Sequence, residues 1–327
     1  MKILFAVQGT GNGHLSRARD VIPHLKTKGE LDVLVSGLHG EIELEYTIKY
    51  KFHGVGFFFG KNGGIDLFRT IKSLKLIRFF KDVFSLPVKN YDLIISDFEP
   101  VSAWACKIRG KKCIALSHQS AFLSANTPRP KKINRFSEFV LKNYAPVNDA
   151  IAVHFKAFDH FIYTPIIRKE VRELEVSNEN HYTVYLPAYS DMNLIEVLNQ
   201  LPDIKWQIFS KHSKDEYEVK NVSISPIQNQ KFLESLASCA GFLCGAGFEG
   251  PAEAMFLGKK LLVVPMKGQY EQYCNAEGAK TLGAGVLETF NQSKIKEIKN
   301  WIATGKTIHV DFPDNAKLLV EKAIRLS

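Results

Sequence analysis

The stretch of sequence that decides the fold reads GFLCGAGFEGPAEAM and spans residues 241–255. Its opening residues are apolar, as in a buried strand, and a glycine-rich turn follows them. Pro251 comes next, at the kind of position that proline takes in the first turn of a helix. A strand that passes through glycines into a helix is the repeating unit of a parallel α/β sheet. We therefore expect a strand, a tight turn and a helix whose free backbone N–H groups favour a diphosphate.

Short apolar runs alternate with helical segments along both halves of the chain. The strand-like runs are residues 3–7, 32–36, 91–96, 112–116, 182–186, 206–209, 241–244 and 261–265. This βαβ rhythm predicts an α/β fold of two doubly wound, Rossmann-like parallel-sheet domains that face a cleft. A boundary near residue 165 gives an N-terminal acceptor-side domain of residues 1–165 and a C-terminal domain of residues 166–327. The last helix, roughly residues 315–327, is a candidate for packing back on the N-terminal domain.

Composition is that of a soluble globular protein, with 327 residues of which 45% are hydrophobic and 24% are charged. The formal net charge of +9 favours an anionic partner, such as a nucleotide phosphate, a lipid headgroup or a nucleic acid. No apolar run approaches the roughly 18 residues of a membrane-spanning helix, and the apolar start at residues 1–7 is too short for a signal peptide. We expect a cytoplasmic protein, whose attachment to the inner face of a membrane could only be peripheral.

The cysteines form no C-x-x-C pair and have no spacing with histidines that suits a zinc site. They are Cys106, Cys113, Cys239, Cys244 and Cys274. We expect buried, reduced thiols, no metal site and no cofactor.

A first glycine loop, GTGNGH at residues 9–14, follows the first strand and precedes a helix expected from about Leu15. A dinucleotide site is not favoured, because the third glycine of G-x-G-x-x-G would fall at His14 and the second strand ends without an acid for a ribose. The imidazole of His14 could take a proton from a hydroxyl nucleophile at the mouth of the cleft. The alternative is a histidine that only caps or packs the helix.

The second glycine loop matches G-x-G-x-x-G literally at Gly245, Gly247 and Gly250, again without the ribose acid one strand later. The carboxylate of Glu253 suits a ribose diol, and amide side chains can pair with sugar hydroxyls as donors and as acceptors. Such polar side chains follow in a loop after the next strand: Gln269, Glu271, Gln272 and Asn275. The alternative for these residues is a solvated, charged helix face.

Taken together, these motifs resemble those of the GT-B glycosyltransferases, most closely the branch that contains the N-acetylglucosaminyltransferase of bacterial peptidoglycan synthesis. The resemblance spans nearly the whole chain. The loop at residues 9–14 is similar to the G-T-G-G-H loop of that branch. Residues 164–168, TPIIR, look like its N-P-V-R linker, which implies a phosphate contact for Arg168.

The stretch from Gly245 to Asn275 resembles the donor motif of the family. Glu253 then matches the ribose-binding glutamate, and Gln272 with Asn275 the pair that contacts the sugar. The donor-binding residues implied by the loops and the resemblance are Gly13, Arg168, Gly245, Gly247, Phe248, Glu249, Gly250, Glu253, Gln269, Glu271, Gln272 and Asn275.

On the acceptor side, residues 117–121, SHQSA, are similar to the H-E-Q-N-A loop of that branch, which implies an acceptor contact for His118. Asp97 looks like the aspartate that orients the catalytic histidine in small-molecule glycosyltransferases of this fold. An aspartate beside His14 would fix the tautomer of the imidazole; capping a helix is the alternative role for Asp97. Glu99 is an alternative partner of His14 on the acceptor side.

The resemblance implies transfer of a sugar from a nucleoside-diphosphate sugar, with UDP favoured, to a hydroxyl acceptor. The acceptor would be a glycan or a lipid-linked precursor of the cell envelope. We expect an inverting mechanism and, because no D-x-D motif occurs, no obligatory metal ion. A nucleotide-sugar epimerase is the rival enzyme. Nucleic acid is not an expected partner, because the charge is dispersed and lacks interleaved aromatics.

Basic and apolar residues alternate at helical spacing in residues 67–81, after the apolar run Phe57–Phe59. Such a stretch can lie in an anionic membrane surface. The alternative is an ordinary amphipathic helix that covers the sheet.

Overall fold

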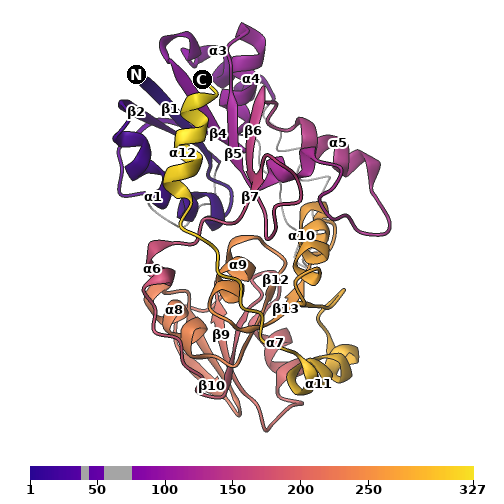
Figure 1. Ribbon diagram of the computed structural model, residues 1–327. Helices are drawn as coiled ribbons and strands as arrows, with labels where there is room; N and C mark the ends of the chain where they lie inside the picture. The colour runs from indigo at the N-terminus through magenta and orange to yellow at the C-terminus, as the bar shows by residue number, and fades with distance from the viewer. Residues whose placement is uncertain (38–43, 55–75) are drawn as a thin grey trace.

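The computed structural model describes residues 1–37, 44–54 and 76–327 (Figure 1). They form two seven-stranded sheets, one from the first half of the chain and one from the second. The runs 57–61 and 67–75 of the basic and apolar stretch lie outside the described residues, and its last residues belong to helix α3.

The first sheet has the strand order β3-β2-β1-β4-β5-β6-β7, and every neighbouring pair is parallel. Its strands are β1 (Lys2–Gln8), β2 (Glu30–Ser36), β3 (Ile48–Phe52), β4 (Leu93–Asp97), β5 (Ile114–Ser117), β6 (Asp149–Val153) and β7 (Ile162–Tyr163). The helices around it are α1 (Asn12–Lys26), α3 (Leu76–Ser85), α4 (Pro100–Arg109) and α5 (Arg135–Asn143), with short 3-10 turns η1 (Val88–Asn90) and η2 (Gln119–Leu123).

The second sheet has the order β10-β11-β9-β8-β12-β13-β14, in which only the pair β10–β11 is antiparallel. Its strands are β8 (His181–Tyr185), β9 (Lys205–Ser210), β10 (Tyr217–Val219), β11 (Val222–Pro226), β12 (Gly241–Gly245), β13 (Lys260–Val264) and β14 (Gly285–Val286). The helical elements are α6 (Lys169–Arg172), α7 (Asp191–Leu198), α8 (Asn229–Ser238), α9 (Glu249–Phe256), α10 (Tyr270–Lys280), η3 (Gln292–Lys294), α11 (Ile295–Thr304) and α12 (Ala316–Arg325).

Both sheets are doubly wound in the same way, as the sequence predicts. Each reverses its strand order beside its first strand, between β1 and β4 and between β8 and β12. Ligands of open α/β sheets bind beyond the carboxyl ends of strands at such a reversal. The two loops with glycines therefore follow β1 and β12, one at each reversal point.

Two local predictions need correction. Helix α1 begins at Asn12 rather than near Leu15, because the chain turns at Gly11, whose φ of 100° is accessible to glycine but strained for other residues. His14 thus lies in the first turn of the helix. The residues after β13 are helical as well: a turn at Gly268 starts α10 at Tyr270, so three of the four polar residues expected in a loop are on that helix.

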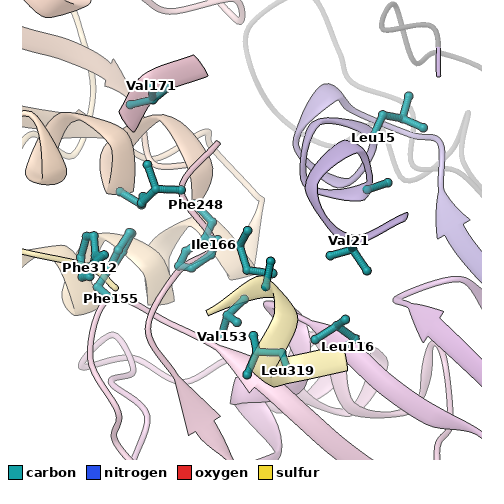
Figure 2. Packing of buried hydrophobic residues seen from close by; sticks show 14 of the residues in the cluster. Leu15, Val21, Leu116, Val153, Phe155, Ile166, Val171, Phe248, Phe312 and Leu319 are labelled. Atoms are coloured by element: carbon teal, nitrogen blue, oxygen red, sulfur yellow. The ribbon is translucent and has the colours of Figure 1, made fainter. Parts of the chain in front are cut away.

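The largest buried apolar cluster continues from one sheet to the other (Figure 2). It contains Leu116 and Val153 from β5 and β6, together with Phe248 beside α9. Helix α12 closes the chain by packing against α1, β5 and β6, and it buries Leu319 in this cluster. The last helix thus returns to the first sheet, as Figure 1 shows in yellow. The boundary near residue 165 falls between β7 and β8 and stays a proposal.

The returning helix offers a test of this shared core. Leu319 is fully buried, whereas its neighbour Leu318 is 48% exposed. We expect Leu319→Ala to lower the free energy of unfolding by about 2–4 kcal/mol, because it leaves a cavity among packed side chains. The matched variant Leu318→Ala should change it by less than about 0.5 kcal/mol. Urea denaturation of both variants measures the difference, and equal effects would contradict the docking of α12.

Candidate active site

His14 and Asp97 meet beyond the ends of the neighbouring strands β1 and β4, which pair in parallel with Val7 opposite Asp97. The Nδ1 atom of His14 lies 2.8 Å from Oδ1 of Asp97. Asp97 has 0% exposure. Burial alone would raise its pKa, but the charges of Arg17 and His14 outweigh burial and hold the pKa below its usual range. His14 and Asp97 therefore contact each other, and Asp97 is ionised near neutral pH.

The residue between the two expected acids has a strained backbone. Phe98 has a φ of 54°, in the left-handed region that non-glycine residues rarely adopt. Its ring is parallel to the imidazole of His14, with 6.4 Å between the ring centres. The turn directs Asp97 toward α1 and lets Glu99, two residues later, face the start of α4.

Glu99 caps helix α4 rather than Asp97, which was the residue considered for a cap. Its oxygens accept from the backbone N–H groups of Val101 and Ser102, at 2.7 and 2.6 Å, and from the hydroxyl of Ser36 at 2.6 Å. Burial raises the pKa of Glu99, and these hydrogen bonds oppose the rise. With its carboxylate occupied and 0% exposed, Glu99 supports the fold of the site, and its geometry gives no support to an acceptor contact.

Arg17, which the sequence did not single out, is the central cation of the site. It lies one turn after His14 on α1 and is 3% exposed. Its Nη2 donates to both oxygens of Asp97, at 2.6 and 2.9 Å, and its Nε donates to Oδ2 at 3.2 Å. Its Nη1 donates to Glu249 at the start of α9. One guanidinium thus bonds both Asp97 and the second domain.

Gln119, from the loop after β5, contacts the other face of the site. Its amide Nε2 lies 3.3 Å from Nε2 of His14 and donates to Glu271 at 3.0 Å. An amide nitrogen can only donate, so the ring nitrogen that it contacts carries the lone pair. Nη2 of Arg17, also a donor, lies 3.1 Å from Nδ1 and favours the opposite tautomer. The carboxylate of Asp97 is nearer to Nδ1, at 2.8 Å, and can only accept, so it favours a proton on Nδ1 of the neutral imidazole. This is the tautomer in which Nε2 can act as a base.

Glu249 brings an acid to the first turn of α9, where a diphosphate was expected. A Cβ atom on Gly13 would lie 3.1 Å from Cγ of Glu249, so the glycine permits the close approach of the two domains. Burial raises the pKa of Glu249 to about 7, with Glu253 and Asp97 adding to the rise and Arg17 opposing it. Because Arg17 also pairs with Asp97, its positive charge offsets the effect of burial on Glu249 only in part.

Glu253 and Arg168, expected to hold the ribose and a phosphate, are bound to each other. Both oxygens of the glutamate accept from the guanidinium, at 2.6 and 2.9 Å. Arg168 also donates to Asn229 at 3.0 Å. Glu253 is in the middle of α9, and its side chain is 5% exposed.

The glycine turn before α9 leaves the start of that helix accessible. No side chain in the described part of the chain caps it. A Cβ atom on Gly247 would meet nothing within 4 Å, whereas one on Gly250 would contact Phe242. Gly247 therefore borders open space, and Gly250 lies against the core. Gly245 lies close to Gln272, whose Oε1 would be 4.0 Å from an added Cβ.

The other expected donor and acceptor residues hold neighbouring backbone. Gln272 accepts from the N–H of Met266 at 2.8 Å, and Asn275 donates to the carbonyl of Ala246 at 3.2 Å. His118 is 1% exposed, and its Nε2 lies 2.7 Å from Oδ1 of Asn275. Burial lowers the pKa of His118 to about 3 and keeps it neutral.

Phe248 stacks on His118, with 3.8 Å between the ring centres. Both expected residues thus form part of the contact between the domains. Gln119 and Gln269 each have a buried Oε1 atom without a hydrogen-bond partner among the described residues.

The arrangement can do one kind of chemistry particularly well. A histidine in the tautomer of a base faces, across the domain boundary, the accessible start of a helix that favours a diphosphate. Two Rossmann-like domains with these groups between them define a nucleotide-sugar glycosyltransferase of the GT-B fold. Residues 1–37, 44–54 and 76–327 contain no group of three or more His, Cys, Asp or Glu side chains placed to hold a metal ion.

The chain belongs to the family described as glycosyl transferase family 1, whose family model matches residues 1–304. No curated protein matches the sequence. The family assignment makes the protein a glycosyltransferase and gives no support to the epimerase alternative.

Solved structures share the fold at low sequence identity. A UDP-glucosyltransferase from Polygonum tinctorium is 13% identical with a TM-score of 0.60, and the match covers 99% of this chain and 93% of that one. Arabidopsis thaliana UGT89C1 complexed with UDP is 15% identical with a TM-score of 0.59, over 99% and 94% of the two chains. Acinetobacter baumannii MurG is 13% identical with a TM-score of 0.52, over 99% and 95%.

Of the helices in the described residues, none is long and apolar enough to cross a membrane.

The perturbed acid at the domain boundary predicts a pH effect. The folded state raises the pKa of Glu249 to about 7, so its contribution to stability is complete below about pH 4.5 and is lost as the pH rises through about 7. Glu249→Gln keeps an oxygen for Arg17 but cannot ionise. We expect the melting temperature of this variant, relative to the wild type, to increase between pH 5 and pH 8.5.

Thermal melts across that pH range measure the difference. The exposed acid variant Glu218→Gln is the control and should follow the wild type. A constant difference between Glu249→Gln and the wild type would show that Glu249 does not titrate in this window.

Proposed function

We propose that this glycosyltransferase moves a sugar from a nucleoside-diphosphate sugar, with UDP favoured, to a hydroxyl acceptor, with inversion and without an obligatory metal ion. The observation that carries the proposal is the pair of His14 and Asp97, 2.8 Å apart, across the domain boundary from the start of α9. A base and an anion-binding helix end are the two parts that such a transfer needs.

In the proposed reaction, the acceptor hydroxyl takes the position of the Gln119 amide beside Nε2 of His14. Nε2 accepts the hydroxyl proton while the oxygen attacks the anomeric carbon. The bond to the diphosphate breaks on the opposite face, so the anomeric configuration inverts. Asp97 stabilises the imidazolium that forms, and its buried, ionised carboxylate is suited to this.

The leaving diphosphate would lie at the start of α9. Backbone N–H groups there carry the positive end of the helix dipole. Arg168 would turn from Glu253 to a phosphate, which frees the carboxylate of Glu253 for the two ribose hydroxyls. The ion pair between them is thus the state that nucleotide binding replaces. Cationic side chains would take the place of a metal ion in stabilising the leaving group.

UDP is the favoured nucleotide because two of the solved structures with this fold are described as a UDP-glucosyltransferase and as a complex with UDP. MurG is among the solved structures as well. Together with the motifs that resemble the peptidoglycan branch, this supports a glycan or lipid-linked precursor of the cell envelope as acceptor. On the sugar side, Gln269, Glu271, Gln272 and Asn275 stay the proposed contacts.

Binding of sugar nucleotides tests the donor assignment. We expect one of UDP-, GDP- and dTDP-sugars to raise the melting temperature, because a ligand that binds only the folded state stabilises it. Glu253→Gln should lose most of this shift, since it replaces one of the two accepting oxygens by an NH2 donor and removes the negative charge, so that each ribose hydroxyl no longer has its own carboxylate oxygen. His14→Ala should keep the shift but lower turnover on the order of 100-fold or more, the usual contribution of a general base.

The two variants separate the site from the mechanism. Near-normal turnover by His14→Ala, with donor binding lost in Glu253→Gln, would support the assigned donor site and contradict the assignment of His14 as the base. A full thermal shift in Glu253→Gln would contradict the donor site itself.

A membrane surface is the proposed place of action, because two helices of the first domain expose large apolar side chains. Helix α5 buries no residue and exposes Phe136 and Phe139. Helix α3 exposes Ile77, Phe80 and Phe84. Exposed basic residues lie beside both groups: Arg78, Lys81, Lys131, Lys132 and Arg135. Apolar side chains among basic ones suit an anionic bilayer.

Cosedimentation with vesicles tests this surface. We expect binding to vesicles that contain phosphatidylglycerol at low salt, and weaker binding at high salt, because charge screening reduces the attraction. Replacing both Phe136 and Phe139 by Ser should reduce binding several-fold. Met192→Ser, an exposed apolar residue of the second domain, is the control. No cosedimentation at low salt would remove the membrane from the proposal.

A further inference from the structure

The guanidinium of Arg17 is placed where the proton chemistry of the site is decided. Oδ1 of Asp97 receives two donors, Nδ1 of His14 at 2.8 Å and Nη2 of Arg17 at 2.6 Å. Nη2 itself lies 3.1 Å from Nδ1 of His14. Both groups converge on one oxygen. Because an arginine N–H can only donate, the carboxylate of Asp97, and not the guanidinium, is the acceptor for a proton on Nδ1.

The carboxylate also depends on Arg17 for its charge. Asp97 is fully buried, and an uncompensated carboxylate in such surroundings tends to hold a proton. His14 is neutral when it is ready to act as a base, so Arg17 is the charge that balances Asp97 before the reaction. Glu249 on α9 and Glu271 on α10 also lie near Arg17. Both are acids, so they cannot balance the negative charge of Asp97 and instead repel it.

We propose that Arg17 is a positioning residue of the transfer reaction: it holds Asp97 ionised and aligned, so that His14 keeps its proton on Nδ1 and presents Nε2 to the acceptor. This rests on the proposed function, in which His14 is the base. Through its bond to Glu249, Arg17 also holds His14 in a fixed position relative to α9, the helix proposed to bind the donor. The two halves of the reaction come from different domains, and this side chain contacts both.

The tautomer of His14 can be measured without any substrate. Nitrogen NMR of protein labelled in its histidine rings distinguishes a proton on Nδ1 from one on Nε2, and the spectrum of His14→Gln assigns the signal. At pH 8 we expect one tautomer, with the proton on Nδ1, in the wild type. Arg17→Met should give a mixture of tautomers. The exposed control Arg325→Met should give the wild-type spectrum, and a wild-type spectrum for Arg17→Met would overturn the proposal.

Kinetics add a readout that a general loss of stability would not reproduce. With the sugar nucleotide that binds the wild type, transfer to acceptor or to water should show kcat lowered about 100-fold in Arg17→Met, within the range of a general base. The KM for the donor should change much less than kcat, because Arg17 reaches the proposed donor helix only through Glu249. The acidic limb of the kcat profile should move to higher pH, since Asp97 then takes up a proton more readily.

Two further variants keep the proposal testable if Arg17→Met does not fold. Arg17→Lys keeps the charge but cannot reach both oxygens of Asp97 with a fork, so kcat should fall about tenfold at any pH, as an alignment loss predicts. Glu249→Gln keeps every contact to Asp97, so the tautomer should stay on Nδ1. A wild-type kcat in Arg17→Lys, or a changed tautomer in Glu249→Gln, would overturn the role given to Arg17.

The outcomes distinguish this proposal from the function on which it rests. If the wild type turns over no sugar nucleotide, the proposed function fails, and the NMR comparison alone decides whether Arg17 sets the tautomer. If turnover is present and Arg17→Met retains both kcat and tautomer, only the role of Arg17 fails.

Discussion

The site depends on one constraint, which is that a buried carboxylate needs a compensating charge. Asp97 has no exposure and is paired with Arg17 and His14. Removing two opposite charges from water costs free energy that their attraction does not reliably return. Such a pair is therefore better explained by the geometry it imposes than by added stability. In the proposed reaction, that geometry sets which ring nitrogen of His14 faces the acceptor.

The same constraint explains why acids and cations alternate across the domain boundary. Glu249 shares Arg17 with Asp97, and Glu253 has Arg168. The cation that is shared leaves Glu249 with a pKa of about 7, because burial is compensated only in part. The three acids named here outnumber the two arginines, and a bound diphosphate would add further negative charge. Arg168 is the cation proposed to bind this added charge, since its present partner is Glu253, the residue proposed to bind the ribose.

Apolar packing keeps this charged layer in place. The largest buried cluster extends over both sheets, and α12 returns from the second domain to lie on α1, β5 and β6. Because interiors are closely packed, such a core resists small displacements. The shared apolar core therefore fixes the position of one sheet relative to the other, and with it the distances between the polar residues at the domain boundary.

Much of the fold was predictable from the sequence, because strand and helix patterns are local. The eight strand-like runs all became strands, and the glycine turns before α1 and α9 were recognised. The strands β3, β6, β7, β10, β11 and β14 were not predicted. These strands have only two to five residues, and such short runs carry little periodic pattern. The helix at α10 was interpreted as a loop, because its glycine and polar residues outweighed a weak apolar stripe.

The sequence by itself determined two doubly wound domains, a histidine after the first strand and a glycine turn before an acidic helix. Each of these features depends on residues that are close together in the chain. Only the tertiary structure decided which side chains meet. Arg17 is 80 residues from Asp97 and 232 from Glu249 in the chain, and Glu99 rather than Asp97 caps α4 because Phe98 turns the backbone between them. Pairings over such separations depend on how two sheets are placed against each other, and no local pattern of residues encodes that placement.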